Sequence, residues 1–380
     1  MIYLDAAATT PVRREVLDAM WPYLTGEFGN PSSHHTLGEQ AAKALADARS
    51  RVATILGCRA AEVIFTSGGT EADNLAIKGI ALAAPRGRHI VTSAIEHEAV
   101  LESCDYLRRQ NGFEIAILPV NAYGSIAVDA FEQAVRPDTT LCSIMLANNE
   151  VGTIQPTAEL ARVAHAQGVP MHTDAVQAAG ALDVNVAHLG VDAMSLSGHK
   201  LGAPKGIGVL FVRGRLQLEP VHHGGGQERG RRSGTENVAG AVGFATALEL
   251  ATALREERMA RLSALRDELI RGVLSAVPEA MLTGHPAERL PGNASFCFPS
   301  TSGEAVLLQL EERGIVCSSG SACAAGSDQP SHVLLAMGIT PEIAQTAVRF
   351  TLSDSTTAEQ IPVVVESVRR AVEAVRAISR

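Results

Sequence analysis

The amino-acid sequence predicts an α/β protein in which a large domain, built on a mostly parallel sheet flanked by helices, is joined to a smaller α+β domain. Two patterns support this prediction. Short apolar, β-branched runs alternate with helical patterns through the first 240 residues, which is typical of parallel sheets. Beyond Gly240 a long helical stretch and a few short strands replace this alternation. The length of 380 residues suits about two or three domains.

The large domain is expected to begin with a helix over residues 39–56. Apolar residues recur there at helical spacing among many alanines, and Gly57 closes the last turn. Apolar runs then predict strands at residues 63–66, 89–93, 114–120, 141–146, 169–173, 193–196 and 206–212. Helices are expected at residues 71–84, 97–109 and 157–167.

The small domain is expected after a helical stretch at residues 241–277, rich in Ala, Leu, Glu and Arg, that bridges the two domains. Short strands are then expected at residues 294–298, 314–317 and 347–352, and helices at 302–313, at 341–346 and from about 357. We assign residues 15–255 to the large domain. Residues 1–14 and 256–380 are assigned to the small one.

Composition excludes several classes of protein. Hydrophobic residues make up 46% of the chain and charged residues 19%, as in globular proteins. The net charge of −9, with no long basic run, disfavours a nucleic-acid partner. We find no apolar run long enough to cross a membrane and no leader pattern, so no membrane partner and a soluble, cytoplasmic protein are expected. The six cysteines contain no Cys-x-x-Cys pair that would indicate a zinc ribbon or a disulfide framework.

Polar residues gather where several predicted strands end. Each group alone is explained better by a helix cap or a turn than by a ligand site. Together they indicate a ligand site, because ligands bind at the carboxyl ends of the strands in open α/β sheets. The groups lie at residues 67–70, 96–97, 148–149, 174–177 and 197–200.

Three of these groups suggest covalent amine chemistry with a phosphorylated cofactor. Lys200 follows an apolar strand, and a desolvated lysine can form a Schiff base with an aldehyde; a solvated surface lysine is the alternative. Gly69 and Thr70 open a helix whose free N–H groups suit a phosphate, although the loop is neither a Walker nor a Rossmann motif. Asp174 ends an apolar strand and needs a cationic partner, such as the pyridinium nitrogen of pyridoxal 5'-phosphate.

Longer stretches resemble cysteine desulfurases of the NifS/IscS type, in the class V aminotransferase family of fold-type I pyridoxal-phosphate enzymes. Any one stretch is weakly specific, but together they run from Tyr3 almost to the end of the chain. The matching stretches are YLDAAATTP, GNPSSHH, FTSGGTEADNLAIKG, EHEAV, NNEVGTIQP, HTDAVQAAG, SLSGHKLGAPKGIGVL, RRSGTEN, SSGSAC and RFTLS.

The resemblance assigns roles to individual residues. It implies that Lys200 forms the Schiff base, that Asp174 pairs with the pyridinium, and that His97 stacks on the ring and moves protons. It implies that Arg349 clamps the substrate carboxylate, with help from Asn30 and Asn149. The remaining cofactor contacts are expected from Gly69, Thr70, Asn149, Gln177, Ser197, His199 and, from the neighbouring subunit of a homodimer, Thr235.

Cys323 separates desulfurases from their aminotransferase relatives. It lies in SSGSACAAGSDQP, a segment of small residues suited to carrying sulfur away from the cofactor. A thiolate is the nucleophile, so a lowered pKa or a nearby base is expected. This sequence has Ala324 where many relatives have a hydroxyl residue after the cysteine. Cys317 is expected to be packed, with a second redox thiol as the alternative.

The expected reaction converts free L-cysteine to L-alanine and leaves a persulfide on Cys323. Selenocysteine lyase is the nearest rival, and an aminotransferase would give no reason for Cys323. A catalytically silent scaffold for sulfur assembly is the rival from another class. An iron–sulfur scaffold, a tRNA-thiolation carrier and a nitrogenase-dedicated partner all fit as acceptors. No intrinsic metal is expected, although Cys323 could transiently ligate a cluster shared with a scaffold.

Overall fold

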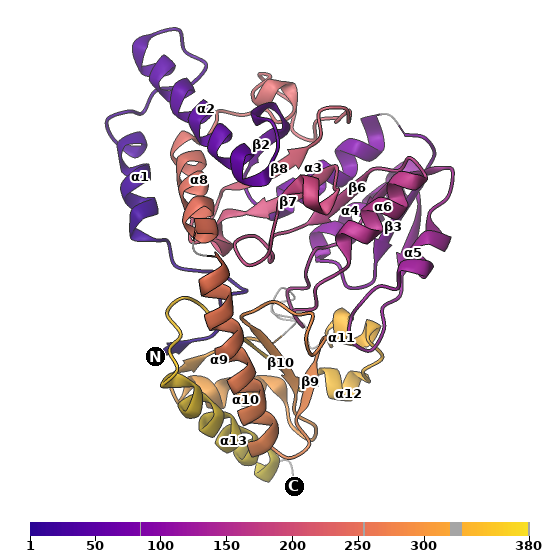
Figure 1. The fold of residues 1–380 in the computed structure, drawn as a ribbon, viewed down its shortest axis with the longest axis vertical. Coiled ribbons are helices and arrows are strands. Elements are labelled where there is room, and N and C mark those ends of the chain that lie inside the picture. Colours follow the sequence, from indigo (N-terminus) through magenta and orange to yellow (C-terminus); the bar gives the residue numbers. More distant parts are fainter. Residues whose placement is uncertain (84, 254, 320–328, 379–380) are drawn as a thin grey trace.

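The computed structural model describes residues 1–83, 85–253, 255–319 and 329–378. Figure 1 shows two lobes stacked along the long axis of the molecule, with both chain ends on the lower one. The upper lobe holds a seven-stranded sheet, and the lower lobe holds a three-stranded sheet with its own helices. This arrangement confirms the predicted α/β fold with a second, smaller α+β unit. The proposed boundary near residue 255 stays a prediction.

The large sheet has the strand order β2-β8-β7-β6-β5-β3-β4. Its neighbouring strands are parallel, except that β8 runs antiparallel to both β2 and β7. The predicted mostly parallel sheet is therefore confirmed. The strands are β2 (Val63–Thr66), β3 (His89–Ser93), β4 (Glu114–Leu118), β5 (Thr139–Ser143), β6 (Met171–Asp174), β7 (Ala193–Ser197) and β8 (Gly208–Val212).

Helices cover both faces of this sheet, since alternate side chains of each strand point to opposite faces. Ile64 and Ile90 pack with α3 (Gly69–Ala83) and α4 (Glu98–Asn111) on one face. Phe65 and Val91 belong to the larger core on the other face. That core also holds residues of α1 (Arg14–Leu24), α2 (Thr36–Leu56), α5 (Val128–Ala134), α6 (Thr157–Ala166), α7 (Val186–Leu189) and α8 (Val238–Ala253).

The lower lobe is built on an antiparallel sheet of order β12-β10-β9. Its core contains the side chains of Phe296, Phe298 and Phe350. A separate two-stranded parallel pair joins β1 (Ile2–Tyr3) to β11 (Ile315–Val316). The other elements are β9 (Met281–Thr283), β10 (Asn293–Cys297), β12 (Ala347–Thr351), α9 (Arg255–Ala276), α10 (Gly303–Glu311), α11 (His332–Ala336), α12 (Pro341–Ala344) and α13 (Gln360–Ile378).

The single helical stretch predicted at residues 241–277 is wrong in one respect, because it is two helices. The axes of α8 and α9 differ by 70°. Most of α8 is buried in the large core, whereas α9 buries one face, including Leu262 and Leu269, in the small core. One straight helix cannot serve both cores. Among the described residues, no single helix is long and apolar enough to cross a membrane; α8 and α9 pass that test only as a bent pair.

Several local predictions match the structure closely. The strands at residues 63–66 and 89–93 have the predicted bounds, and Gly57 ends α2 with a left-handed φ of 68°. The sequence patterns did not reveal α1, which packs so closely on α8 that a Cβ on Gly243 would lie 2.5 Å from the sulfur of Met20. Short 3-10 turns complete the fold at η1 (Ala60–Glu62), η2 (Gly198–Lys200) and η3 (Glu228–Gly230).

The N-terminal segment from Asp5 to Arg13 contacts both lobes. The N–H of Ala6 donates to the carbonyl of Thr351 in the small lobe at 3.2 Å. The N–H of Thr10 donates to the carbonyl of His199, and that of Arg13 to Gly202, both in the large lobe. This segment therefore runs past the carboxyl end of β7, where Lys200 lies.

Candidate active site

The predicted polar groups meet at one edge of the large sheet. Asp174 and Ser197 are the last residues of β6 and β7, which are neighbours in the sheet. Gly69 begins α3 shortly after β2, and His97 caps α4 shortly after β3. These strands run parallel, so their carboxyl ends share one edge.

A cradle without side-chain bulk lies between β7 and the start of α3. A Cβ on Gly69 would lie 2.8 Å from Val176 Cγ2 and 3.4 Å from the Cβ of Ser197. Ser197 is buried, whereas Thr70 is exposed at the first turn of α3. The free N–H groups and the helix dipole at this end of α3 favour an anion.

Asp174 is a buried acid with His97 and Lys200 nearby. Its Oδ1 accepts a hydrogen bond from the N–H of Val176 at 2.8 Å. Burial raises the pKa of Asp174, while the nearby charges of His97 and Lys200 act against that rise. A cation beside this carboxylate would lower the cost of its burial.

Lys200 is half-buried and anchored to the N-terminal segment. Its Nζ donates to the carbonyl oxygens of Ala7 and of Ala8, the latter at 2.7 Å. Gln177 Nε2 donates to the same carbonyl of Ala7 at 3.0 Å. Backbone carbonyls from residues almost 200 positions earlier therefore orient the lysine.

Two histidines lie at the edge of the sheet near Lys200. His199 Nδ1 lies 3.2 Å from the hydroxyl of Thr9, and burial together with the charge of Lys200 lowers the pKa of His199 to about 4. Its imidazole is therefore neutral at pH 7. His97 is half-buried, and its Nδ1 accepts from the N–H of Ala99 at 3.1 Å, which fixes the ring at the start of α4.

Arg349, on β12 of the small lobe, reaches the same region and is only 3% exposed. Its Nη1 donates to the carbonyl of Asn149 at 2.8 Å, and its Nη2 to Asp5 Oδ1 at 3.0 Å. Its Nε is buried without a hydrogen-bond partner among the described residues. Arg349 is therefore a buried guanidinium with donors still available. Asp5 lies within the YLDAAATTP stretch but was not among the expected site residues.

Sequence reasoning also missed a buried polar layer beneath Asp174. His172 Nε2 lies 3.0 Å from the hydroxyl of Ser195 and 3.7 Å from Asp73 Oδ1. Burial lowers the pKa of His172 to about 3, so its ring is neutral, and burial raises the pKa of Asp73 well above its usual value. Burial also raises the pKa of Glu96 to about 8. The sequence offers one signal for this buried layer: polar residues inside an apolar strand, as in the run HTD at residues 172–174.

Other predicted residues lie apart or outside the described ranges. Asn30 is exposed, and its Oδ1 accepts from the N–H of Ser32; Thr235 is exposed between η3 and α8. Cys323 lies outside the described residues. Cys317 packs against the small core, and burial raises the pKa of its thiol to about 12, which disfavours a redox role.

The chemical groups at this edge of the sheet fit a flat pyridine aldehyde that carries a phosphate. It offers a cradle at Gly69 that a Cβ would fill, a buried carboxylate at Asp174 and an amine at Lys200. Among the residues that the structure describes, no group of three or more His, Cys, Asp or Glu side chains could hold a metal ion.

Comparisons with known proteins agree with this chemistry. The model of the family "Aminotransferase class-V" matches residues 2–364. The chain is 46% identical to "Cysteine desulfurase IscS" of Dictyoglomus turgidum, over 100% of this chain and 96% of that relative. It is 48% identical to "Cysteine desulfurase IscS" of Methanosarcina thermophila, over 100% of this chain and 93% of that relative.

Solved structures give the same result. A "NIFS-LIKE PROTEIN" superposes with a TM-score of 0.92 at 37% identity, covering 98% of this chain and 99% of that one. The structure "SspA in complex with cysteine" superposes with a TM-score of 0.80 at 36% identity, covering 93% and 99%. The chain therefore belongs to the class-V aminotransferase family, as a pyridoxal-phosphate-dependent cysteine desulfurase of the NifS/IscS type.

Proposed function

We propose that the enzyme converts L-cysteine to L-alanine and places the sulfur on Cys323, from which acceptor proteins remove it. The observation that carries this proposal is the meeting of Lys200, Asp174 and Arg349 at one sheet edge. Lys200 supplies the amine, Asp174 a buried carboxylate beside it, and Arg349 a buried cation from the other lobe.

The cofactor is held by residues of the large lobe. Gly69, Thr70, Ser197 and His199 hold its phosphate, and the neutral His199 ring can donate or accept one hydrogen bond there. Asp174 pairs with the pyridinium nitrogen, and Asn149 and Gln177 contact the oxygen side of the ring. When bound, pyridoxal phosphate withdraws electrons from the substrate Cα.

Arg349 binds the substrate carboxylate. Its hydrogen bonds to Asn149 and Asp5 fix the guanidinium plane, so little side-chain freedom is lost when the substrate arrives. A planar fork of N–H donors matches a carboxylate bidentately. Asn30 is the second proposed contact.

Lys200 moves the proton from the substrate Cα once its amine is free, and His97 assists at the face of the ring. The carbonyls of Ala7 and Ala8 give the free amine a fixed position, because both accept hydrogen bonds from Nζ. Positioning of this kind shortens the path for proton transfer.

Cys323 then attacks the substrate sulfur as a thiolate. The new S–S bond forms as the Cβ–S bond breaks; its electron pair stays on carbon, and that carbon takes up a proton to give alanine. The test is the Cys323→Ser protein assayed with cysteine and a thiol reductant. We expect loss of both sulfide and alanine, whereas Cys317→Ser should keep both. Normal production by Cys323→Ser would overturn the role of Cys323.

The sulfur acceptor and the exact substrate are proposed from relatives. Relatives named as cysteine desulfurases, and a neighbour solved with cysteine, favour cysteine over selenocysteine and favour an active enzyme over a silent scaffold. An iron–sulfur scaffold, a tRNA-thiolation carrier and a nitrogenase-dedicated partner remain the three proposed acceptors. Incubating persulfidated enzyme with each purified acceptor, and measuring which removes the labelled sulfur, decides between them. A cytoplasmic location stays a prediction.

A homodimer is proposed as the working form, with Thr235 of one subunit near the phosphate of the other. An exposed apolar stripe on α1 supports it, since Leu17, Trp21 and Leu24 follow one helix face and Phe28 lies just beyond. A Trp21→Glu protein should sediment as a monomer, while Arg14→Glu on the same helix should remain a dimer. A wild-type monomer would refute the proposal.

A further inference from the structure

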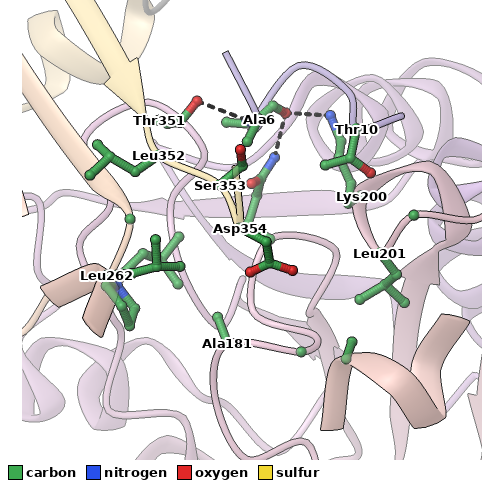
Figure 2. Close-up of a pocket in the computed structure, with 18 of the residues that line it drawn as sticks. Ala6, Thr10, Ala181, Lys200, Leu201, Leu262, Thr351, Leu352, Ser353 and Asp354 are labelled. Carbon is green, nitrogen blue, oxygen red and sulfur yellow. Dashed lines mark hydrogen bonds between the residues drawn. The ribbon is translucent and has the colours of Figure 1, made fainter. Parts of the chain in front are cut away.

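A cavity lies beside Lys200, between the two lobes. Its volume is about 350 Å³. Figure 2 shows Lys200 and Thr10 on one side of it and Leu262, Leu352 and Asp354 among the residues around it. The walls come from the N-terminal segment, the loop after β6, η2, α8, α9 and the segment after β12.

This cavity is separate from the proposed cofactor cradle. Of the residues assigned to the cofactor, only Gln177 and Lys200 line it. Gly69, Asp174 and Ser197 do not. The carbonyl of Ala7, which accepts from both Lys200 and Gln177, belongs to the shared wall. Val176, which borders the cradle at Gly69, also lines this cavity, so the cavity and the cradle are neighbours that share one wall.

The body of the cavity is apolar. Leu201, Leu262, Leu290 and Leu352 are buried side chains that line it, and Ala181 leaves space between them. Leu262 and Leu352 belong to the small core, whereas Leu201 and Leu290 belong to the large one. An apolar ligand would gain free energy by displacing water from this surface and would bridge the two lobes.

The polar side chains at one end carry an excess of positive charge. Arg13 Nη2 pairs with Asp354 Oδ2 at 2.6 Å, and Arg258 Nε lies 3.5 Å from Asp354 Oδ1. Two guanidinium groups therefore face one carboxylate. Arg258 Nε is buried and has no hydrogen-bond partner within the described ranges, while Nη2 donates to the carbonyl of Gly180. A buried N–H donor without a partner is costly, and an anion would satisfy it.

We propose that this cavity binds a monocarboxylate with an apolar body of about seven to ten carbon atoms. The carboxylate lies against Arg13 and Arg258, and the apolar body extends among the four leucines. The size follows from the volume, because 350 Å³ corresponds to roughly a dozen water-sized groups at about 30 Å³ each. The site goes beyond the desulfurase reaction and does not depend on it.

The test uses isothermal titration of the holoenzyme with octanoate, 1-octanol and octylamine as probes. We expect saturable binding of one octanoate per chain, binding of octanol at least tenfold weaker, and no measurable binding of octylammonium. In Arg258→Met, octanoate should fall to the affinity of octanol. In Ala181→Phe, which fills the space, both should lose binding. Arg271→Met, an exposed arginine on the same helix, is the matched control and should behave as wild type.

Folding effects are separated from binding by melting each variant without ligand. If Arg258→Met melts early, Arg258→Lys keeps the charge and should retain the preference for octanoate over octanol. Octanol binding as tightly as octanoate to the wild type would overturn the anionic assignment. Absence of saturable octanoate binding, or equal binding by Ala181→Phe, would overturn the site. None of these readouts uses cysteine turnover, so failure of the proposed reaction would leave them unchanged.

Discussion

Replacing Arg349 by lysine tests the proposed carboxylate clamp. Among the described residues, two of the five N–H donors of Arg349 are engaged, through Nη1 to Asn149 and Nη2 to Asp5. The remaining donors, including the unpartnered Nε, are available to a substrate carboxylate. Lysine keeps the positive charge, but its ammonium cannot offer two parallel donors from a plane.

The expected loss is about one charge-assisted hydrogen bond to the substrate. Such a bond contributes roughly 1.5–3 kcal/mol. Because about 1.4 kcal/mol is a factor of ten, KM for L-cysteine should rise roughly 10- to 150-fold. The turnover number should change less, because the carboxylate stays bound to Arg349 before and during proton transfer, so the lost bond weakens substrate and transition state alike.

The assay is alanine formation over a range of cysteine concentrations, with a melting curve for each protein. Lysine still faces the carboxylate of Asp5, so the melting temperature should fall only slightly. Arg313→Lys, which makes the same change at an exposed arginine of the small lobe, is the matched control. A KM within threefold of wild type, in a protein that melts normally, would refute the clamp.

Three further substitutions probe other parts of the site. Because burial raises the pKa of Glu96 to about 8, the folded protein keeps a proton that the unfolded chain releases, so this group's contribution to stability falls as pH rises from 4.5 through 8. Glu96→Gln cannot titrate at this position. In urea unfolding, the free energy of unfolding of the wild type should therefore fall by about 2 kcal/mol relative to that of Glu96→Gln between pH 6.5 and 8, at about 1.36 kcal/mol per pH unit. Parallel pH dependences of the two proteins would contradict this. Gly69→Val should weaken cofactor retention on dialysis at least tenfold, because a Cβ there already lies 2.8 Å from Val176, whereas Gly26→Val meets nothing within 4 Å and should retain it. Lys200→Ala should lose the visible absorbance of covalently attached cofactor, and retention of that absorbance would move the attachment elsewhere.

Local pattern was enough to predict most secondary structure and the edge where the polar groups meet. The bounds of β2 and β3 and the end of α2 at Gly57 follow from short apolar runs and one glycine. The bend between α8 and α9 could not be predicted this way, because both halves are helical by composition. Only the two separate cores that they bury against require it.

The sequence by itself identified the groups proposed to carry the chemistry: Lys200, Asp174 and the glycine cradle each stand at a strand end, a position that local periodicity reveals. Only the tertiary structure decided what holds them. The carbonyls of Ala7 and Ala8 meet Lys200, and Asp5 meets Arg349, across sequence separations of 192 to 344 residues. Backbone carbonyls have no side-chain signature, and an ion pair between distant residues leaves no periodic pattern, so these contacts appear only when the two lobes pack together.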